Sequence, residues 1–287
     1  MKLAVSNIAW AATERNEAYA LLRDHGIEGL EIAPGLFFAG AADPFVPTLD
    51  EARSALDALE GAGLRLVSMQ SLLFGVTGAA LFGNAAAHSA LRRGMSRAIG
   101  LAGRFGIPNL VFGSPAQRVI PDAMDRALAR QIAAEAFREM GDEAAQAGTS
   151  LGVEFNPAAY GTNFLNEGKD ALAFVQEVDH PAVTLILDVG AMEMNGQRDQ
   201  IADLALMAKD RISHVHISEP NLAPAPADTD AAAAVMTAMT DSGYGRWFSI
   251  EMKAGDGLAA LSAALDRLTE AARLASRNIG PAAKVSP

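Results

Sequence analysis

The sequence predicts an α/β fold, a (β/α)8 TIM barrel, from three observations. A short β-type run recurs along the 287 residues, and an Ala-rich helical run separates each from the next. The β-type runs are nearly continuous Val, Ile and Leu, which is typical of parallel strands covered on both faces. Gly or Pro often stands between helix and strand, and Gly readily ends a helix. Eight strands alternating with eight helices favour a closed barrel.

The first expected strand is KLAVSN, residues 2–7, and no helix precedes it. Seven further strands are expected within the segments 25–34, 62–70, 105–115, 147–157, 180–190, 211–220 and 244–253. The expected helical runs are 14–25, 49–61, 85–104, 122–147, 168–178, 198–210, 228–242 and 256–276. The first strand is followed by SNIAW rather than by a Gly-rich nucleotide-binding turn, which disfavours the rival fold, a doubly wound open sheet.

We expect residues 1–276 to form a single barrel domain and residues 277–287 to form a flexible C-terminal tail. Three long connections, 34–48, 71–84 and 219–228, follow strands and therefore lie on the active face of a barrel. Long ordered loops on that face usually shape a site or an interface. The 71–84 loop is apolar enough to form the interface of a homo-oligomer.

The composition excludes several classes of partner and site. The net charge of −11 and the pI of about 4.9 predict an acidic surface, which repels nucleic acid. The chain has no cysteine, which excludes disulfides and Cys-ligated zinc or iron–sulfur centres. No long uncharged stretch is dominated by large apolar side chains, so no membrane partner is expected. The apolar N-terminal stretch is too short for a signal peptide, so a cytoplasmic location is expected.

The residues that carry chemistry in a barrel lie at the C-terminal ends of its strands. The ends of the last four expected strands offer Glu154, Asp188, His216 and Glu251, each within an apolar run. A single acidic residue at such a place is more often a helix cap, but three acidic residues and one His on four successive strands converge on the barrel axis. Three carboxylates and one His would repel one another unless a positive charge lay between them, and a divalent cation is the simplest solution. The mixed oxygen and imidazole set predicts one divalent metal ion: Mn²⁺, Co²⁺, Mg²⁺ or Zn²⁺.

Other strand ends supply candidate substrate contacts, and His214 shares a strand face with His216. His214 lies farther from the mouth, so we expect it behind the metal ligands or in the core. Lys253 could bind a phosphate or carboxylate, steady an enediolate, or pair with Glu219. Four aromatic residues could form an apolar wall over the substrate or belong to the loop core: Trp10, Phe37, Phe38 and Phe74. The expected substrate-binding residues are Asn7, Glu31, Gln70, Asn156 and Lys253.

The motifs GVEFNP, LILDVG, HVHISEP and FSIEMK, in this order, resemble the sugar phosphate isomerase/epimerase superfamily of xylose-isomerase-like barrels. That superfamily includes ketose 3-epimerases and inosose dehydratases, and the resemblance runs from KLAVSN to the helix ending near Ala275. The resemblance implies that Glu154, Asp188, His216 and Glu251 are the metal ligands. It also implies that Glu154 and Glu251 form the catalytic acid/base pair on opposite faces of the substrate.

The sequence departs from two members of this group at functional positions. Ketose 3-epimerases of the tagatose type carry Glu, His and Arg where this chain has Tyr160, Ala191 and Leu222. The sugar contacts of that subfamily are therefore missing, and a free ketohexose is not expected to bind in the same way. Endonuclease IV binds three zinc ions through many His ligands, and Gln70 and Ser114 stand at two of the strand ends that would have to supply them.

The expected function is a divalent-metal-dependent isomerase or epimerase of a small sugar or sugar-like polyol ketone. A metal-stabilised enediolate would form when a carboxylate removes the proton beside the carbonyl. Proton return to the opposite face gives epimerisation, and return to the neighbouring carbon gives isomerisation. Loss of a β-hydroxyl gives dehydration, so a dehydratase of a cyclic polyol or dehydroshikimate-type substrate is an alternative. A non-catalytic ligand-binding barrel is a third reading.

Overall fold

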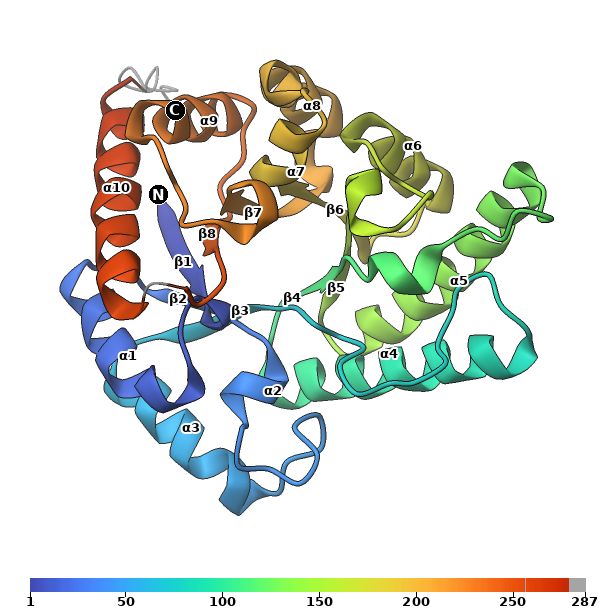
Figure 1. Ribbon diagram of the computed structural model, residues 1–287, viewed down its shortest axis with the longest axis horizontal. Coiled ribbons are helices and arrows are strands. Elements are labelled where there is room, and N and C mark those ends of the chain that lie inside the picture. The colour runs from blue at the N-terminus through green and yellow to red at the C-terminus, as the bar shows by residue number, and fades with distance from the viewer. Residues whose placement is uncertain (256, 279–287) are drawn as a thin grey trace, which may run out of the picture.

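The computed structural model describes residues 1–255 and 257–278, and in it eight parallel strands close into a barrel in chain order (Figure 1). The ring closes where Lys2 pairs with Trp247. The predicted (β/α)8 barrel is therefore confirmed. The strands are β1 Lys2–Ser6, β2 Gly29–Ile32, β3 Arg65–Met69, β4 Asn109–Phe112, β5 Ser150–Glu154, β6 Val183–Asp188, β7 Ile212–Ser218 and β8 Trp247–Glu251.

Figure 1 shows the strands at the centre and the helices around them. The sequence did not predict the short α2 and α7, which directly follow β2 and β6. The α-helices are α1 Arg15–Asp24, α2 Pro34–Phe37, α3 Leu49–Gly61, α4 Ala85–Phe105, α5 Arg126–Gln146, α6 Gly168–Val178, α7 Val189–Met194, α8 Ile201–Ala208, α9 Thr229–Asp241 and α10 Gly257–Asn278. Within the described ranges, no helix is long and apolar enough to cross a membrane.

The helix ends follow their capping residues. α4 ends at Gly106, whose φ of 65° is the left-handed conformation that favours glycine. α5 begins four residues later than predicted, at Arg126, because the side chain of Asp125 accepts a hydrogen bond from Leu128 N at 3.0 Å. α10 continues through Asn278, two residues beyond its predicted end. The rest of the predicted tail, 279–287, lies outside the described residues.

A line of aromatic side chains supports the loops at one side of the barrel mouth. Phe112 of β4 packs edge-on against Phe137 of α5, which packs edge-on against Phe174 of α6. Phe164 continues the line from Phe174 to Phe82 of the loop after β3. Edge-to-face contacts of this kind add stability beyond the buried area. The loops that follow β3 and β5 therefore pack against each other through one aromatic core.

The 71–84 loop uses most of its apolar side chains within this chain. Leu72, Leu81 and Phe82 are buried in the core, whereas Phe74 is 61% exposed. Because these side chains already have partners, the loop's apolar character does not by itself indicate a second subunit. The homo-oligomer stays a prediction.

Candidate metal centre

The four predicted metal ligands lie together at the C-terminal end of the barrel. Glu154, Asp188 and Glu251 are the last residues of β5, β6 and β8, and His216 lies two residues before the end of β7. A register shift between Leu185 and Ile186 brings Asp188 opposite His216. Each ligand side chain offers an atom within 4.8 Å of the others. All four residues are buried, with at most 8% of their surface exposed.

His216 directs one ring nitrogen at the three carboxylates. Its Nδ1 lies 3.0 Å from Glu154 Oε1, 3.3 Å from Glu251 Oε2 and 3.5 Å from Asp188 Oδ2. Burial alone would lower the pKa of His216, but Glu251 and the other carboxylates raise it well above its ordinary value. The nitrogen therefore lies in a strongly negative environment, which suits a metal ligand.

The three carboxylates of this cluster lie close enough to repel one another. Burial raises the pKa of Glu251 well above its ordinary value, and repulsion from Glu154 and Asp188 raises it further, against the attraction of His216. A divalent cation among these side chains would relieve that repulsion. Three carboxylates and one imidazole form a donor set that suits Mn²⁺, Co²⁺, Mg²⁺ or Zn²⁺. The residues present therefore fit the predicted ion.

Glu31 lies behind His216 and does not line the cavity, unlike the substrate contact that the sequence predicts. Its Oε2 lies 3.2 Å from His216 Nε2 and 3.3 Å from His214 Nε2. Burial would raise the pKa of Glu31, but the two histidines hold it well below its ordinary value. Metal-ligating histidines usually donate their second N–H to such a carboxylate, which fixes the ring orientation. His214 is fully buried behind the ligands, as expected.

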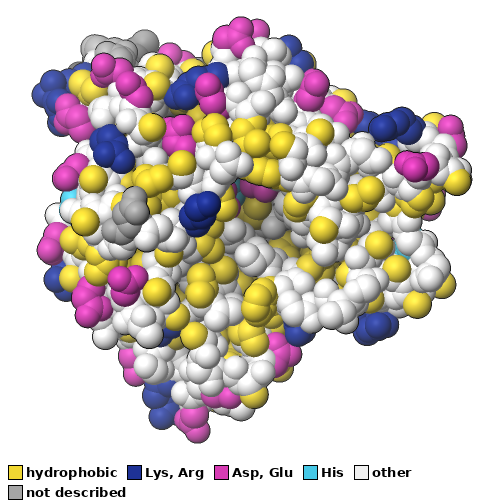
Figure 2. Space-filling model, viewed as in Figure 1, with side chains coloured by type: hydrophobic (Ala, Val, Ile, Leu, Met, Phe, Trp, Pro, Cys, Tyr) yellow, Lys and Arg dark blue, Asp and Glu magenta, His cyan; other side chains and the backbone are white. Residues whose placement is uncertain are grey.

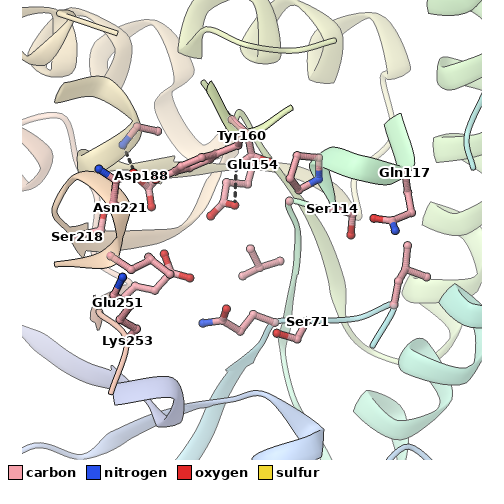
Figure 3. Close-up of a pocket in the computed structure, with 18 of the residues that line it drawn as sticks. Ser71, Ser114, Gln117, Glu154, Tyr160, Asp188, Ser218, Asn221, Glu251 and Lys253 are labelled. Atoms are coloured by element: carbon pink, nitrogen blue, oxygen red, sulfur yellow. Dashed lines mark hydrogen bonds between the residues drawn. The ribbon is translucent and has the colours of Figure 1, made fainter. Parts of the chain in front are cut away.

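A cavity of about 730 Å³ opens above the four ligands, and Figure 2 shows this face of the molecule hollowed near its centre. Figure 3 shows Glu154 and Glu251 reaching into the cavity from different sides. Of the predicted substrate contacts, Gln70, Asn156 and Lys253 line this cavity. Phe74 is the member of the predicted aromatic wall in the lining, because Trp10, Phe37 and Phe38 are buried in the core.

Three of the predicted substrate contacts are engaged by the protein itself. Asn7 lies outside the lining and accepts a 2.7 Å hydrogen bond from Ala33 N, and its amide nitrogen donates to Ala33 O at 3.4 Å. Gln70 Nε2 donates to Ser6 Oγ at 2.7 Å and to Glu31 Oε1 at 2.9 Å. Asn156 Nδ2 donates to Glu154 Oε2 at 3.1 Å.

Lys253 is exposed at the rim of the cavity. The alternative that it pairs with Glu219 is not seen among the described residues. Glu219 Oε1 instead accepts a hydrogen bond from Ala227 N at 2.9 Å. Lys253 is therefore available to a ligand that enters the cavity.

Tyr160, Ala191 and Leu222 all line the cavity. These are the three positions at which the sequence departs from the tagatose-type epimerases, so the difference falls on the site itself. Burial raises the pKa of Tyr160, and the nearby charges of Asp188, Glu251 and Glu154 add to the effect, against a hydrogen bond from the backbone of Asn221. From the sequence, Tyr160 was noted only because it stands where the tagatose-type epimerases have Glu, and no role was predicted for it.

Two further residues near the centre were missed by the sequence reasoning. Gly113 follows β4 and lines the cavity, and Arg118 is fully buried beside Asn156. Burial lowers the pKa of Arg118 to about 10, against the attraction of Glu154, so it remains charged at neutral pH. Both lie in the loop GSPAQR, which has no regular alternation of polar and apolar residues to indicate which side chains point inward.

A curated relative resembles part of this chain. The L-ribulose 3-epimerase of Methylomonas sp. (strain DH-1) is 37% identical over 84 residues, which are 29% of this chain. The match spans 28% of the relative's own length.

Solved structures match the fold over almost the whole chain. The D-psicose 3-epimerase of Clostridium cellulolyticum H10, solved with D-tagatose, superposes with a TM-score of 0.73 at 16% identity over 96% of this chain and 99% of that one. The 3-keto-D-glucoside 4-epimerase of E. coli gives 0.72 at 18% identity, over 95% and 99%. The D-allulose 3-epimerase of Methylomonas sp., solved with D-allulose, gives 0.70 at 20% identity, over 96% of each chain.

At these identities the structural likeness establishes the fold alone. The sequence profile of the xylose isomerase-like TIM barrels, however, matches residues 19–274. That range contains all of the proposed metal ligands and seven of the eight strands. The predicted resemblance is confirmed, and the chain belongs to the xylose isomerase-like TIM barrel family.

Proposed function

We propose that this protein is a divalent-metal-dependent isomerase or epimerase of a small sugar or sugar-like polyol ketone. The observation that carries the proposal is the convergence of Glu154, Asp188, His216 and Glu251, of which the three carboxylates line one cavity. The names of the relatives, which are epimerases of ketoses and of a 3-keto-glucoside, support the same reaction class.

The proposed roles follow from the chemistry of the four side chains. A divalent ion held by them would stabilise the negative charge that develops when the C–H beside a carbonyl loses its proton. Glu154 and Glu251 reach the cavity from β5 and β8, so one removes the proton on one face of the substrate. The other returns a proton on the opposite face, which gives epimerisation.

The lining favours a substrate without strong negative charge. Glu219 joins the three metal-site carboxylates in it, and among the described lining residues Lys253 is the basic one. We propose that Lys253, Gln70 and Asn156 contact the substrate at its polar groups. Because Tyr160, Ala191 and Leu222 replace the polar residues of the tagatose type, the substrate is bound differently from a free ketohexose in that subfamily.

The test begins with metal content and ends with proton exchange. Wild type and Asp188→Ala are reconstituted with Mn²⁺, desalted and analysed for metal, beside the control Asp203→Ala at an exposed position of α8. We expect about one ion per chain in wild type and control and almost none in Asp188→Ala. A panel of ketoses in D2O is then followed by NMR for exchange of the proton beside the carbonyl.

Each outcome has a distinct meaning. Equal, negligible metal in all three proteins would remove the basis of the proposal. Bound metal with no exchange on any ketose would favour the non-catalytic barrel. Loss of water with an absorbing enone product would favour the dehydratase.

A further inference from the structure

Arg118 is a buried cation beside the proposed centre. It closes the 3-10 turn Pro115–Arg118 after β4, and its side chain is fully buried. Its Nη2 donates to Asn156 Oδ1 at 2.7 Å, while Nε and Nη1 have no hydrogen-bond partner among the described residues. Glu154 attracts the guanidinium through space, but no carboxylate in the described part of the chain forms a direct ion pair with it. Burying a charge in this way is unfavourable, which indicates a role that a neutral side chain does not fill.

The hydrogen bonds run in one direction from Arg118 to Glu154. A guanidinium only donates, so the oxygen of the Asn156 amide must face Arg118. The amide nitrogen then faces Glu154, and it donates to Oε2 at 3.1 Å. A carboxylate only accepts, so the orientation of Asn156 is fixed by the chemistry of its two partners. The other oxygen, Oε1, lies 3.0 Å from His216 Nδ1 and is turned toward the centre.

Gly113 limits Glu154 from the side of β4. A Cβ atom at this position would lie 2.5 Å from Glu154 Oε2 and 3.5 Å from Asn156 Oδ1. The carboxylate therefore rests against backbone on one side and receives the Asn156 amide on the other. Only glycine leaves the room for this approach.

The loop after β4 and the loop after β5 are also joined by contacts that do not involve the Arg118 side chain. Asn163 accepts from Ile120 N at 2.7 Å and donates to Ile120 O at 2.9 Å. Thr162 Oγ1 donates to Arg118 O at 3.3 Å. The loops would therefore stay joined without the guanidinium, and Asn163 offers a matched control for loop packing alone.

We propose that Arg118 and Asn156 are positioning residues that hold one oxygen of Glu154 and turn the other toward the metal ion. This inference rests on the function proposed above, because it assigns Glu154 to the metal and to proton transfer. The sequence predicts Asn156 as a substrate contact; in this proposal its main role is to orient Glu154.

The test measures Mn²⁺ binding by calorimetry without substrate, in Arg118→Met, Asn156→Leu, the double variant and the control Asn163→Ala. Loss of a residue that orients a metal ligand typically weakens metal binding by 10- to 100-fold, so we expect at least about a tenfold loss in Arg118→Met. Charge alone predicts the opposite sign, because removing a cation should tighten the binding of Mn²⁺. The double variant should match Asn156→Leu, since both changes break one chain of contacts.

Proton-exchange kinetics and stability complete the design. We expect kcat to fall in Arg118→Met with KM little changed, and Arg118→Lys to recover part of the loss. Asn163→Ala should lower the melting temperature without weakening Mn²⁺ binding. Because Asn156→Leu leaves Arg118 buried without a partner, the double variant keeps the test interpretable if that single variant does not fold.

Tighter or unchanged Mn²⁺ binding in Arg118→Met would overturn the inference. So would a double variant whose loss of affinity is the sum of the two single losses. A loss of affinity in Asn163→Ala equal to that in Arg118→Met would overturn it as well. Glu154→Gln separates this failure from failure of the proposed function. If Glu154→Gln binds Mn²⁺ as wild type does, the function proposal itself is wrong. If Glu154→Gln loses Mn²⁺ and Arg118→Met does not, only the positioning role is wrong.

Discussion

Both halves of the barrel mouth carry polar residues at the C-terminal ends of their strands, but these residues have different partners in the two halves. In the half built from β5 to β8, the acidic side chains and His216 point at one another around a common centre. In the half built from β1 to β4, the polar side chains bind other protein groups: Asn7 binds the backbone of Ala33, and Gln70 binds Ser6 and Glu31. One half therefore holds the reactive charges. The other supplies Glu31 and Arg118, which lie behind those charges, and part of the cavity wall.

The largest effect is expected when a reactive carboxylate is changed. We expect Glu251→Gln to lower the rate of proton exchange by about 10²- to 10⁴-fold, because the amide neither removes nor returns a proton. NMR in D2O at saturating Mn²⁺ measures the rate. Glu219→Gln is the control, since Glu219 lines the same cavity but binds Ala227 N. A loss of less than tenfold in Glu251→Gln would mean that this half of the mouth is not the reactive one.

The orienting half is tested at Glu31, whose carboxylate lies 3.2 Å from His216 Nε2. We expect Glu31→Gln to weaken Mn²⁺ binding by about 10- to 100-fold, because the amide has one acceptor oxygen instead of two and no negative charge. It cannot satisfy Gln70 on one side and the two histidines on the other, so the ring of His216 is held less firmly. Calorimetry measures the affinity, and Glu28→Gln, an exposed acid paired with Arg65, is the control. If Glu31 contacted the substrate instead, KM would rise and the affinity for Mn²⁺ would not change.

The same difference explains what the sequence could predict. Glu154, Asp188, His216 and Glu251 each interrupt an apolar strand, so the barrel topology alone directs all four to one point. That rule fails for Glu31, because a side chain at a strand end faces either the open cavity or the layer beneath it, and the register decides which. Glu31 pairs with Ser6 and Ser68 and points at the histidines under the cavity floor.

Loop residues were beyond the reach of sequence patterns for a different reason. Arg118 and Gly113 act through contacts with Asn156 and Glu154, which are about 40 residues away along the chain. No local periodicity encodes such a contact, and a charged residue in a loop is ordinarily solvated. Only the packing of the loop after β4 against the loop after β5 shows that Arg118 is buried.

A smaller effect is expected at Asn7, whose side chain binds the backbone of the same half of the mouth and not a metal ligand. Asn7→Ala removes the side-chain hydrogen bonds to Ala33 N and O, which are buried. We expect the free energy of unfolding to fall by about 1–3 kcal/mol, since the buried N–H of Ala33 loses its acceptor, whereas Ala33 O still accepts from Leu36 N and Phe37 N. Urea denaturation measures this, and Mn²⁺ affinity should stay within about twofold of wild type. Unchanged stability with a raised KM would restore Asn7 as a substrate contact.

The smallest effect is expected at the rim, where Phe74 lines the cavity with 61% of its surface exposed. Because little of the ring is buried in the protein, Phe74→Ala should change the free energy of unfolding by less than about 0.5 kcal/mol. If the ring covers a bound substrate, KM should rise by roughly three- to tenfold with kcat unchanged, because the contact is equal in ground and transition states. Leu206→Ala, equally exposed on α8, is the control and should change neither. A fall in kcat at constant KM would instead mean that Phe74 acts on the reacting groups, and the division between a reactive half and a shaping half would have to be redrawn.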